Sequence, residues 1–187
     1  MGTDKAFIEI DGRPLVVRVV DALHEAGADS VIVIGGDVAR LHAIGLAAIA
    51  DPRPSTGPVG GLVSALELAD EPDLVVVLSC DLLDPSPDAI RQVVNRLALA
   101  PCASGVVPIV AGRHQWLHAG WRTSAALGPV RKAFDERSRS FSVCTQELHL
   151  VVLADLPAES VADADVPEDL PSHARRWSVE PPDRRTH

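Results

Sequence analysis

The sequence predicts an open α/β fold with a mainly parallel sheet. Short apolar runs alternate with segments of helical periodicity along 187 residues, a length that suits one domain. Hydrophobic residues make up 47% of the chain and aromatic residues only 3%, so the core must consist mainly of Val, Leu, Ile and Ala. This composition favours a sheet covered by Ala-rich helices over an aromatic-rich β-sandwich.

The expected elements follow from these patterns in order. An extended stretch at 7–10 ends in an Asp-Gly turn, and Pro14 begins a helix that Gly27 stops. The continuous apolar run at 30–34 is typical of a strand buried on both faces. Further strands are predicted at 46–50, 74–78, 104–110 and 148–153, with a less regular candidate at 114–118. Further helices are predicted at 37–43, 58–69, 87–99, 121–137 and 166–177. We expect a single domain over 1–177 and a flexible tail over 178–187.

The charge and the cysteines exclude several classes of protein. Seventeen Lys and Arg stand against 26 Asp and Glu, and the formal charge of -9 opposes general binding to nucleic acid or to anionic membranes. Three cysteines without CxxC spacing argue against a disulfide framework or a zinc ribbon. No apolar run approaches the ~18 residues of a membrane span. The sequence therefore predicts a cytoplasmic protein.

The strongest candidate site residue is an aspartate. In open α/β sheets, ligands bind outside the carboxyl ends of the strands. Asp81 follows the 74–78 strand after Ser79 and Cys80, so its carboxylate is expected at that edge. There it would either bind Mg²⁺ together with substrate phosphates or cap the following turn.

Other candidates are weaker when taken alone. Gly57, Gly60 and Gly61 precede a helix, where they let an anion or a base approach the backbone or serve packing alone. Asp51 closes the strand before this loop and is equally suited to form a turn. Lys5, on an irregular segment, is by itself typical of a solvated surface cation.

Two further chemistries are not expected. His114 and His118 are four residues apart in a pattern that looks extended, without the acidic partner of a zinc protease. No Gly-x-Ser-x-Gly elbow is present, and Cys80 has no histidine partner evident in the sequence. Hydrolase chemistry is therefore disfavoured.

Six blocks in a fixed order carry a resemblance to a known family. They are Met-Gly-Thr-Asp-Lys-Ala at 1–6, Asp-Gly-Arg-Pro-Leu at 11–15, Asp51 with Gly-Pro-Val-Gly-Gly-Leu at 57–62, Ser-Cys-Asp at 79–81, Gly-Arg-His-Gln-Trp-Leu-His-Ala-Gly-Trp-Arg at 112–122 and Asp-Ala-Asp-Val-Pro-Glu-Asp-Leu at 163–170. Together they resemble the molybdenum cofactor guanylyltransferases of the nucleotidyltransferase superfamily over about residues 1–170. The resemblance implies a Rossmann-like, three-layer nucleotidyltransferase sheet.

The resemblance also implies a reaction and site residues. GMP passes from GTP to the phosphate of molybdopterin, pyrophosphate leaves, and Mg²⁺ is required. By position, Lys5 matches the lysine on the nucleotide phosphates and Asp81 the aspartate that binds Mg²⁺. Asp51 matches a nucleotide-contacting aspartate, and the loop glycines match the loop beside the base. Asp165 matches a second position that helps to hold the metal in some members. The protein partners left open are molybdoenzymes or other proteins of cofactor maturation.

The chemistry suits these residue types. Attack of one phosphate on another brings negative charge together, so a lysine and a cation near the α-phosphate supply electrostatic stabilisation and positioning. No protein nucleophile is needed, because the terminal phosphate of the acceptor attacks directly.

The chain departs from the family pattern in three places. The family motif begins with a β-strand and a glycine-rich loop with an arginine, roughly fourteen residues that would precede Met1. Without that N-terminal strand, the sheet should open at its middle and expose two strand edges. Leu82-Leu83 replaces the usual proline pattern after Asp81, and Gly35-Gly36-Asp37 stands where an asparagine commonly meets guanine. A cytidylyltransferase using CTP and a truncated, non-catalytic relic that binds nucleotide or a partner therefore stay as alternatives.

Overall fold

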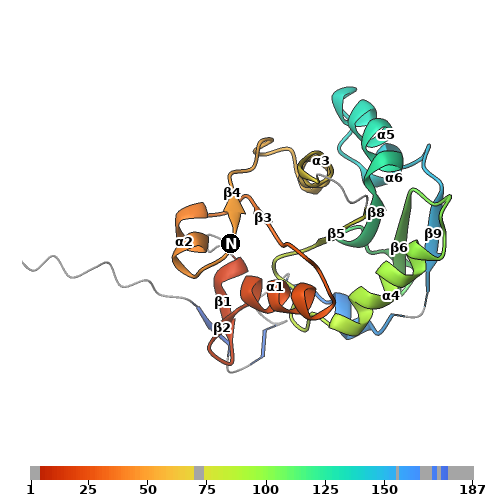
Figure 1. Cartoon of the computed structure of the whole chain (residues 1–187). Helices are drawn as coiled ribbons and strands as arrows, with labels where there is room; N and C mark the ends of the chain where they lie inside the picture. The colour runs from red at the N-terminus through yellow and green to blue at the C-terminus, as the bar shows by residue number, and fades with distance from the viewer. Residues whose placement is uncertain (1–4, 70–73, 155, 165–169, 172–173, 177–187) are drawn as a thin grey trace, which may run out of the picture.

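The computed structural model describes residues 5–69, 74–154, 156–164, 170–171 and 174–176. These residues form an α/β fold in three layers, as the sequence predicted, with strands between two layers of helices (Figure 1). Asp165 and the predicted 178–187 tail lie outside the described residues. No helix in the described ranges is long and apolar enough to cross a membrane.

The helices and strands follow the predicted order closely. The α-helices are α1 (Leu15–Glu25), α2 (Val38–Ala43), α3 (Pro58–Leu68), α4 (Pro87–Ala98), α5 (Thr123–Asp135) and α6 (Phe141–Cys144), and the 3₁₀ turns are η1 (Lys5–Phe7) and η2 (Ala158–Val161). The strands are β1 (Ile8–Ile10), β2 (Arg13–Pro14), β3 (Val33–Ile34), β4 (Ala48–Ile49), β5 (Leu74–Leu78), β6 (Gly105–Val110), β7 (Arg113–His114), β8 (His118–Arg122), β9 (Leu150–Leu153) and β10 (Arg175–Arg176).

The largest sheet has the path β5-β8-β6-β7, with β9 beside β6. β8 pairs antiparallel with both β5 and β6, and β6 pairs parallel with β9. β5, β6 and β9 therefore run in the same direction, and β8 runs against them. The sheet predicted to be mainly parallel is therefore mixed, because β8 lies between β5 and β6 and pairs antiparallel with both. The carboxyl ends of β5 and β6 consequently lie at one edge of the sheet, together with the segment that leads into β8.

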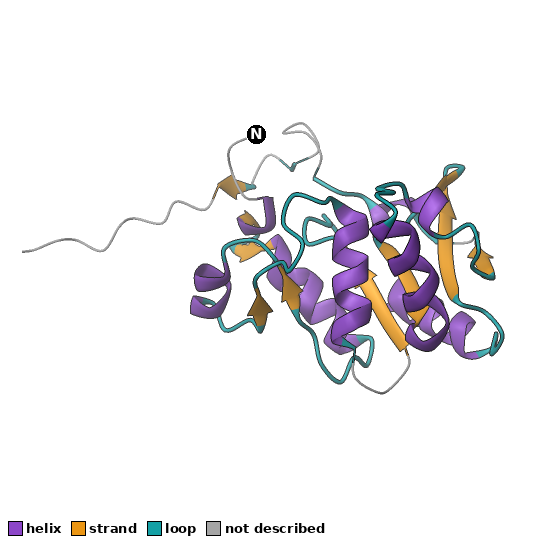
Figure 2. Ribbon diagram, turned by 90° about the horizontal axis from the view of Figure 1, so that it is seen from above, coloured by secondary structure: helices purple, strands orange, loops and turns teal. Residues whose placement is uncertain are grey.

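Helices cover both faces of this sheet. α3 and α5 pack on one face around Trp121, which is fully buried. α4 packs on the other face, where Val93 and Leu97 lie against Gly120 of β8. α1 packs beside α4 on this second face (Figure 2). The alternation of side chains along β8 thus fixes which helix covers which face.

β3 and β4 form a separate parallel pair. Among the described strands, β3 pairs with β4 alone and β5 pairs with β8 alone, so each keeps one edge without a strand partner. α1 and α3 bridge the two parts, because both pack against residues of the β3 and β5 regions.

The prediction that 30–34 is buried on both faces is wrong. Only Val33 is buried, and Ile32 is 47% exposed. The physical reason is that β3 is short and has a strand partner on one side only.

The region around Trp121 was also predicted wrongly. The structure places a strand at His118–Arg122, and the helix begins at Thr123. Pairing of β8 with two neighbours outweighs local helical periodicity there. At the other end, Arg175–Arg176 pair with β1 as a strand, although a helix was predicted to reach residue 177. Much of that predicted helix lies outside the described residues.

Candidate functional site

Two predicted site residues meet at the carboxyl edge of the sheet. The Nζ atom of Lys5 lies 3.5 Å from Oδ2 of Asp81. Lys5 belongs to η1, and Asp81 follows β5, so residues 76 positions apart in the sequence form one ion pair. Their side chains are 29% and 19% exposed, so the pair is accessible to a ligand.

Neighbouring groups hold Asp81 in place. The Ser79 hydroxyl donates a hydrogen bond to Oδ1 of Asp81. The backbone N–H of Ala164 donates to the Asp81 carbonyl at 3.0 Å, and Leu82 forms a β-bridge with Asp163. The chain after η2 therefore pairs with the residues that follow β5.

The glycine loop leads into α3. Gly57 has a φ of +76°, a conformation that favours glycine, and is the residue before the helix. A Cβ atom on Gly60 would lie 1.9 Å from Oγ1 of Thr56, so packing of the loop itself requires this glycine. A Cβ atom on Gly57 or Gly61 would meet nothing within 4 Å. These two glycines therefore border open space at the start of the helix.

Asp51 lies at the carboxyl ends of β3 and β4. A Cβ atom on Gly35, just after β3, would come within 3.4 Å of the Asp51 Cβ. Oδ1 of Asp51 accepts a hydrogen bond of 2.8 Å from the Arg53 backbone N–H. The side chain thus forms the turn that opens the loop toward Gly57, one of its two predicted roles.

His118 lies beneath this edge of the sheet. It is the register partner of Leu78, the last residue of β5, and is 2% exposed. Neither ring nitrogen has a hydrogen-bond partner among the residues that the structure describes. Burial lowers the pKa of His118 to about 4, so the ring is neutral at physiological pH. His118 lies in β8 and His114 in β7, so the two histidines do not share one face of a helix.

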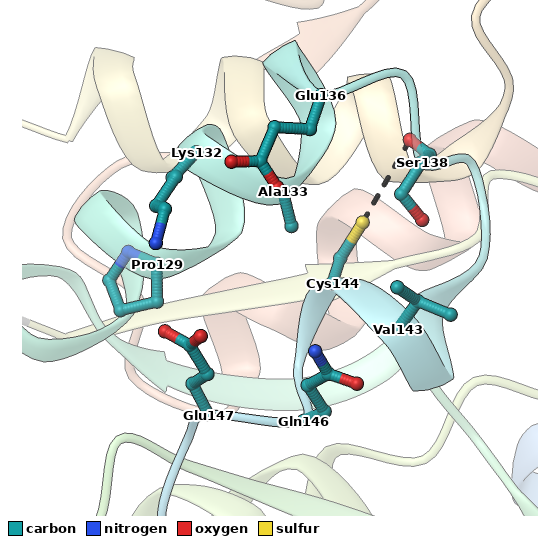
Figure 3. Close-up of a pocket in the computed structure, with 9 residues that line it drawn as sticks. All are labelled: Pro129, Lys132, Ala133, Glu136, Ser138, Val143, Cys144, Gln146 and Glu147. Atoms are coloured by element: carbon teal, nitrogen blue, oxygen red, sulfur yellow. Dashed lines mark hydrogen bonds between the residues drawn. The ribbon is translucent and has the colours of Figure 1, made fainter.

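A pocket of the molecule lies away from this sheet edge. A cavity of about 160 Å³ lies between α5 and α6, lined by Lys132, Glu136, Cys144 and Glu147 among others (Figure 3). None of the predicted site residues lines it. Among the described residues, no group of three or more His, Cys, Asp or Glu is placed to hold a metal ion. Asp81 would therefore need oxygen ligands from a substrate to complete a coordination shell.

Sequence reasoning missed the part played by Ser79. The Ser-Cys-Asp block drew attention to the aspartate, but the hydroxyl two residues earlier orients its carboxylate. Cys80 and Asp81 form a turn after β5, so the contact depends on the local path of the chain and no strand periodicity in the sequence indicates it.

Comparisons with known proteins identify the family of this chain. The family model of the MobA-like NTP transferase domain matches residues 1–147. The chain belongs to this family. A molybdenum cofactor guanylyltransferase from Cereibacter sphaeroides is 38% identical over 174 residues, covering 90% of this chain and 86% of that protein. Another from Xanthomonas euvesicatoria pv. vesicatoria is 39% identical over 82 residues, and this match covers 44% of the chain and 40% of the relative.

A solved structure shows that the fold extends over nearly the whole chain. Molybdopterin-guanine dinucleotide biosynthesis protein A from Archaeoglobus fulgidus superimposes with a TM-score of 0.70 at 17% identity. The superposition covers 90% of this MobA-like chain and 87% of the archaeal one. The family and the fold expected from the six sequence blocks are thus confirmed.

Proposed function

We propose that this chain transfers GMP from GTP to the phosphate of molybdopterin and releases pyrophosphate. The single observation that carries the proposal is the ion pair of Lys5 and Asp81 at the carboxyl edge of the sheet. Relatives named molybdenum cofactor guanylyltransferases, which match over most of this chain, support the choice of reaction.

The chain's residues have distinct tasks in this reaction. A phosphate oxygen of the acceptor forms a bond to the α-phosphorus of GTP, and the bond to the β-phosphate breaks. Lys5 contributes a fixed positive charge beside the phosphates. Gly57 and Gly61 leave space for the nucleotide at the start of α3, and Asp51 shapes the loop that presents them. CTP in place of GTP is the alternative that a nucleotide panel separates.

Asp81 fits a magnesium ion. Its carboxylate is a hard oxygen ligand. The Lys5 ammonium lies 3.5 Å from Oδ2, so a positive charge is favourable beside this carboxylate. When bound, Mg²⁺ would neutralise charge on the phosphates and the pyrophosphate leaving group. Asp165, which lies outside the described residues, is proposed as a second ligand on the family resemblance alone. Ser79 orients the Asp81 carboxylate.

The direct test is pyrophosphate release by the purified chain with molybdopterin, Mg²⁺ and either GTP or CTP. We expect release with GTP, and a loss of at least about a hundredfold in kcat/KM for Asp81→Asn and Lys5→Ala. Asp84→Asn is the matched control, because Asp84 lies three residues away in an ion pair of similar length, 3.6 Å, with Arg18. Release with CTP alone would identify a cytidylyltransferase. Nucleotide binding without pyrophosphate release would support the alternative of a truncated, non-catalytic relic.

The remaining expectations stay predictions. These are the cytoplasmic location and the interaction with molybdoenzymes or other proteins of cofactor maturation. Pull-down of the tagged chain from cells with intact molybdenum metabolism, followed by mass spectrometry, tests the second.

A further inference from the structure

Three aromatic rings form a stack on the surface of the molecule. The His114 and Trp116 rings lie 4.9 Å apart between centroids at an interplanar angle of 12°, and the Trp116 and Phe141 rings lie 5.4 Å apart at 9°. The chain has only three Phe and three Trp and no Tyr. Two of these six residues are in this one stack, so its composition contrasts with the aliphatic core.

The stack has one exposed end. Trp116 and Phe141 are half-buried and pack against the core between α3, α5 and the sheet. His114, on β7, is exposed. The outermost ring therefore rests on two rings that the core holds in place, which pre-organises its outer face for a further planar group.

The stack lies at the same edge of the sheet as Asp81. His114 follows the β6–β7 turn at the carboxyl end of β6, which runs in the same direction as β5. Leu117, the neighbour of Trp116, accepts a 3.0 Å hydrogen bond from the Ser79 backbone N–H. The Ser79 hydroxyl in turn donates a hydrogen bond to Oδ1 of Asp81. Two hydrogen bonds thus connect the segment of the stack to the predicted reaction centre.

The stack and the glycine loop lie on opposite sides of Asp81. β3, β4 and the loop that leads to Gly57 lie to one side of β5, and β8 and β6 lie to the other (Figure 1). β7, which carries His114, pairs with β6 on that second side. A transfer between two bound substrates requires both to meet at the reacting phosphate from different directions. If GTP binds on the Gly57 side of Asp81, the acceptor must approach from the side of the aromatic stack.

We propose that the outer face of His114, supported by Trp116 and Phe141, binds the planar fused nitrogen heterocycle of the acceptor. This inference rests on the proposed function, because it assigns the acceptor's pterin ring to this stack and the acceptor's phosphate to the neighbourhood of Asp81. His114 is a binding residue for the ring and takes no part in bond making.

The test separates ring binding from catalysis. The probe is 6-hydroxymethylpterin, a pterin without phosphate, whose fluorescence anisotropy is followed as the full chain is added. We expect saturable binding that weakens about tenfold in His114→Ala, the effect of one stacking contact. His114→Phe, which keeps a flat ring, should restore most of the affinity. His24→Ala is the control, since His24 is an exposed histidine at the end of α1.

Each outcome decides between the two proposals. Absence of pterin binding, or binding that His114→Ala leaves unchanged, would overturn the platform even if GTP turnover is intact. Displacement of the pterin by GTP would also overturn it, because the two ligands would share one subsite. Binding that depends on His114 in a chain without guanylyl transfer would instead keep the ring site and reject the proposed reaction.

Discussion

β5 and β6 are built from similar residues but are buried differently. Val106 and Val107 of β6 are fully buried, whereas Val75, Val76 and Val77 of β5 are only half-buried. The β5 sequence is the more uniformly apolar of the two. The difference arises because β6 has strand neighbours on both sides, while β5 has one.

This contrast bears on where the chemistry lies. The side with β6 and β8 is a packed scaffold that carries the aromatic stack. The side with β3 and β4 carries Asp51 and the glycine loop, joined to the scaffold through α1 and α3. Asp81 lies at the boundary. The comparison predicts that mutations on the scaffold side change stability most, and that mutations at the loop change ligand binding most.

The largest expected effect is on stability. Trp121→Ala should lower the free energy of unfolding by roughly 3–5 kcal/mol, because the side chain is fully buried between the sheet and α3 and α5. Ile32→Ala, on the β3 side, should cost less than about 1 kcal/mol, because Ile32 is 47% exposed. Urea unfolding of both variants measures this. Similar losses at the two positions would remove the distinction between the two sides.

The next effect is a pH dependence. The pKa of His118 is about 4 in the folded chain and near 6.5 when unfolded, so the unfolded state binds the proton first. Stability should therefore be full above about pH 6.5 and fall as pH drops toward 4, by up to about 3 kcal/mol. Thermal melts at pH 7 and pH 5 test this, with His118→Leu as the comparison. If the melting temperature of the wild-type chain falls between pH 7 and pH 5 by no more than that of His118→Leu, this prediction is wrong.

A smaller effect distinguishes two glycines. A Cβ atom on Gly120 would lie 2.9 Å from Cγ1 of Val93, so Gly120→Ala should cost about 1–3 kcal/mol. Gly61→Ala meets no neighbour within 4 Å and lies in α3, so it should leave stability unchanged or raise it by up to about 1 kcal/mol. The affinity of the Gly61→Ala variant for GTP should nevertheless fall, because the added methyl group enters the open space beside the loop. Calorimetric titration with GTP, next to unfolding curves, would show whether stability and binding separate in this way.

Much of the fold could be predicted from the sequence. The 74–78 strand and the 58–69 helix were located to within a residue, because LVVVL and a proline at the first position of an apolar helix are strong local signals. β8 could not be found this way, since its residues become a strand by pairing with β5 and β6. Lys5 alone looked like a surface cation, and only the family resemblance assigned it a role. Its contact with Asp81 depends on tertiary structure.

The smallest expected effect concerns single amide groups. Along β5, alternate backbone N–H groups face β8, and the others face the edge that has no partner among the described strands. Hydrogen exchange should therefore alternate between slow and fast from Leu74 to Leu78. In β6, which is flanked by β8 and β9 near its start, protection should be continuous over Gly105 and Val106. Uniform protection along β5 would show that the edge is covered in solution.

The central claim is that two subsites flank Asp81, and amide chemical-shift mapping by NMR tests it most directly. GTP with Mg²⁺ should shift the amides of Gly57, Gly61 and Asp81 and leave His114 unchanged. The pterin probe should shift His114 and the Trp116 indole and leave Gly57 unchanged. If both ligands shift the same amides, or if GTP shifts the residues of the cavity between α5 and α6 instead, the account of this site is wrong.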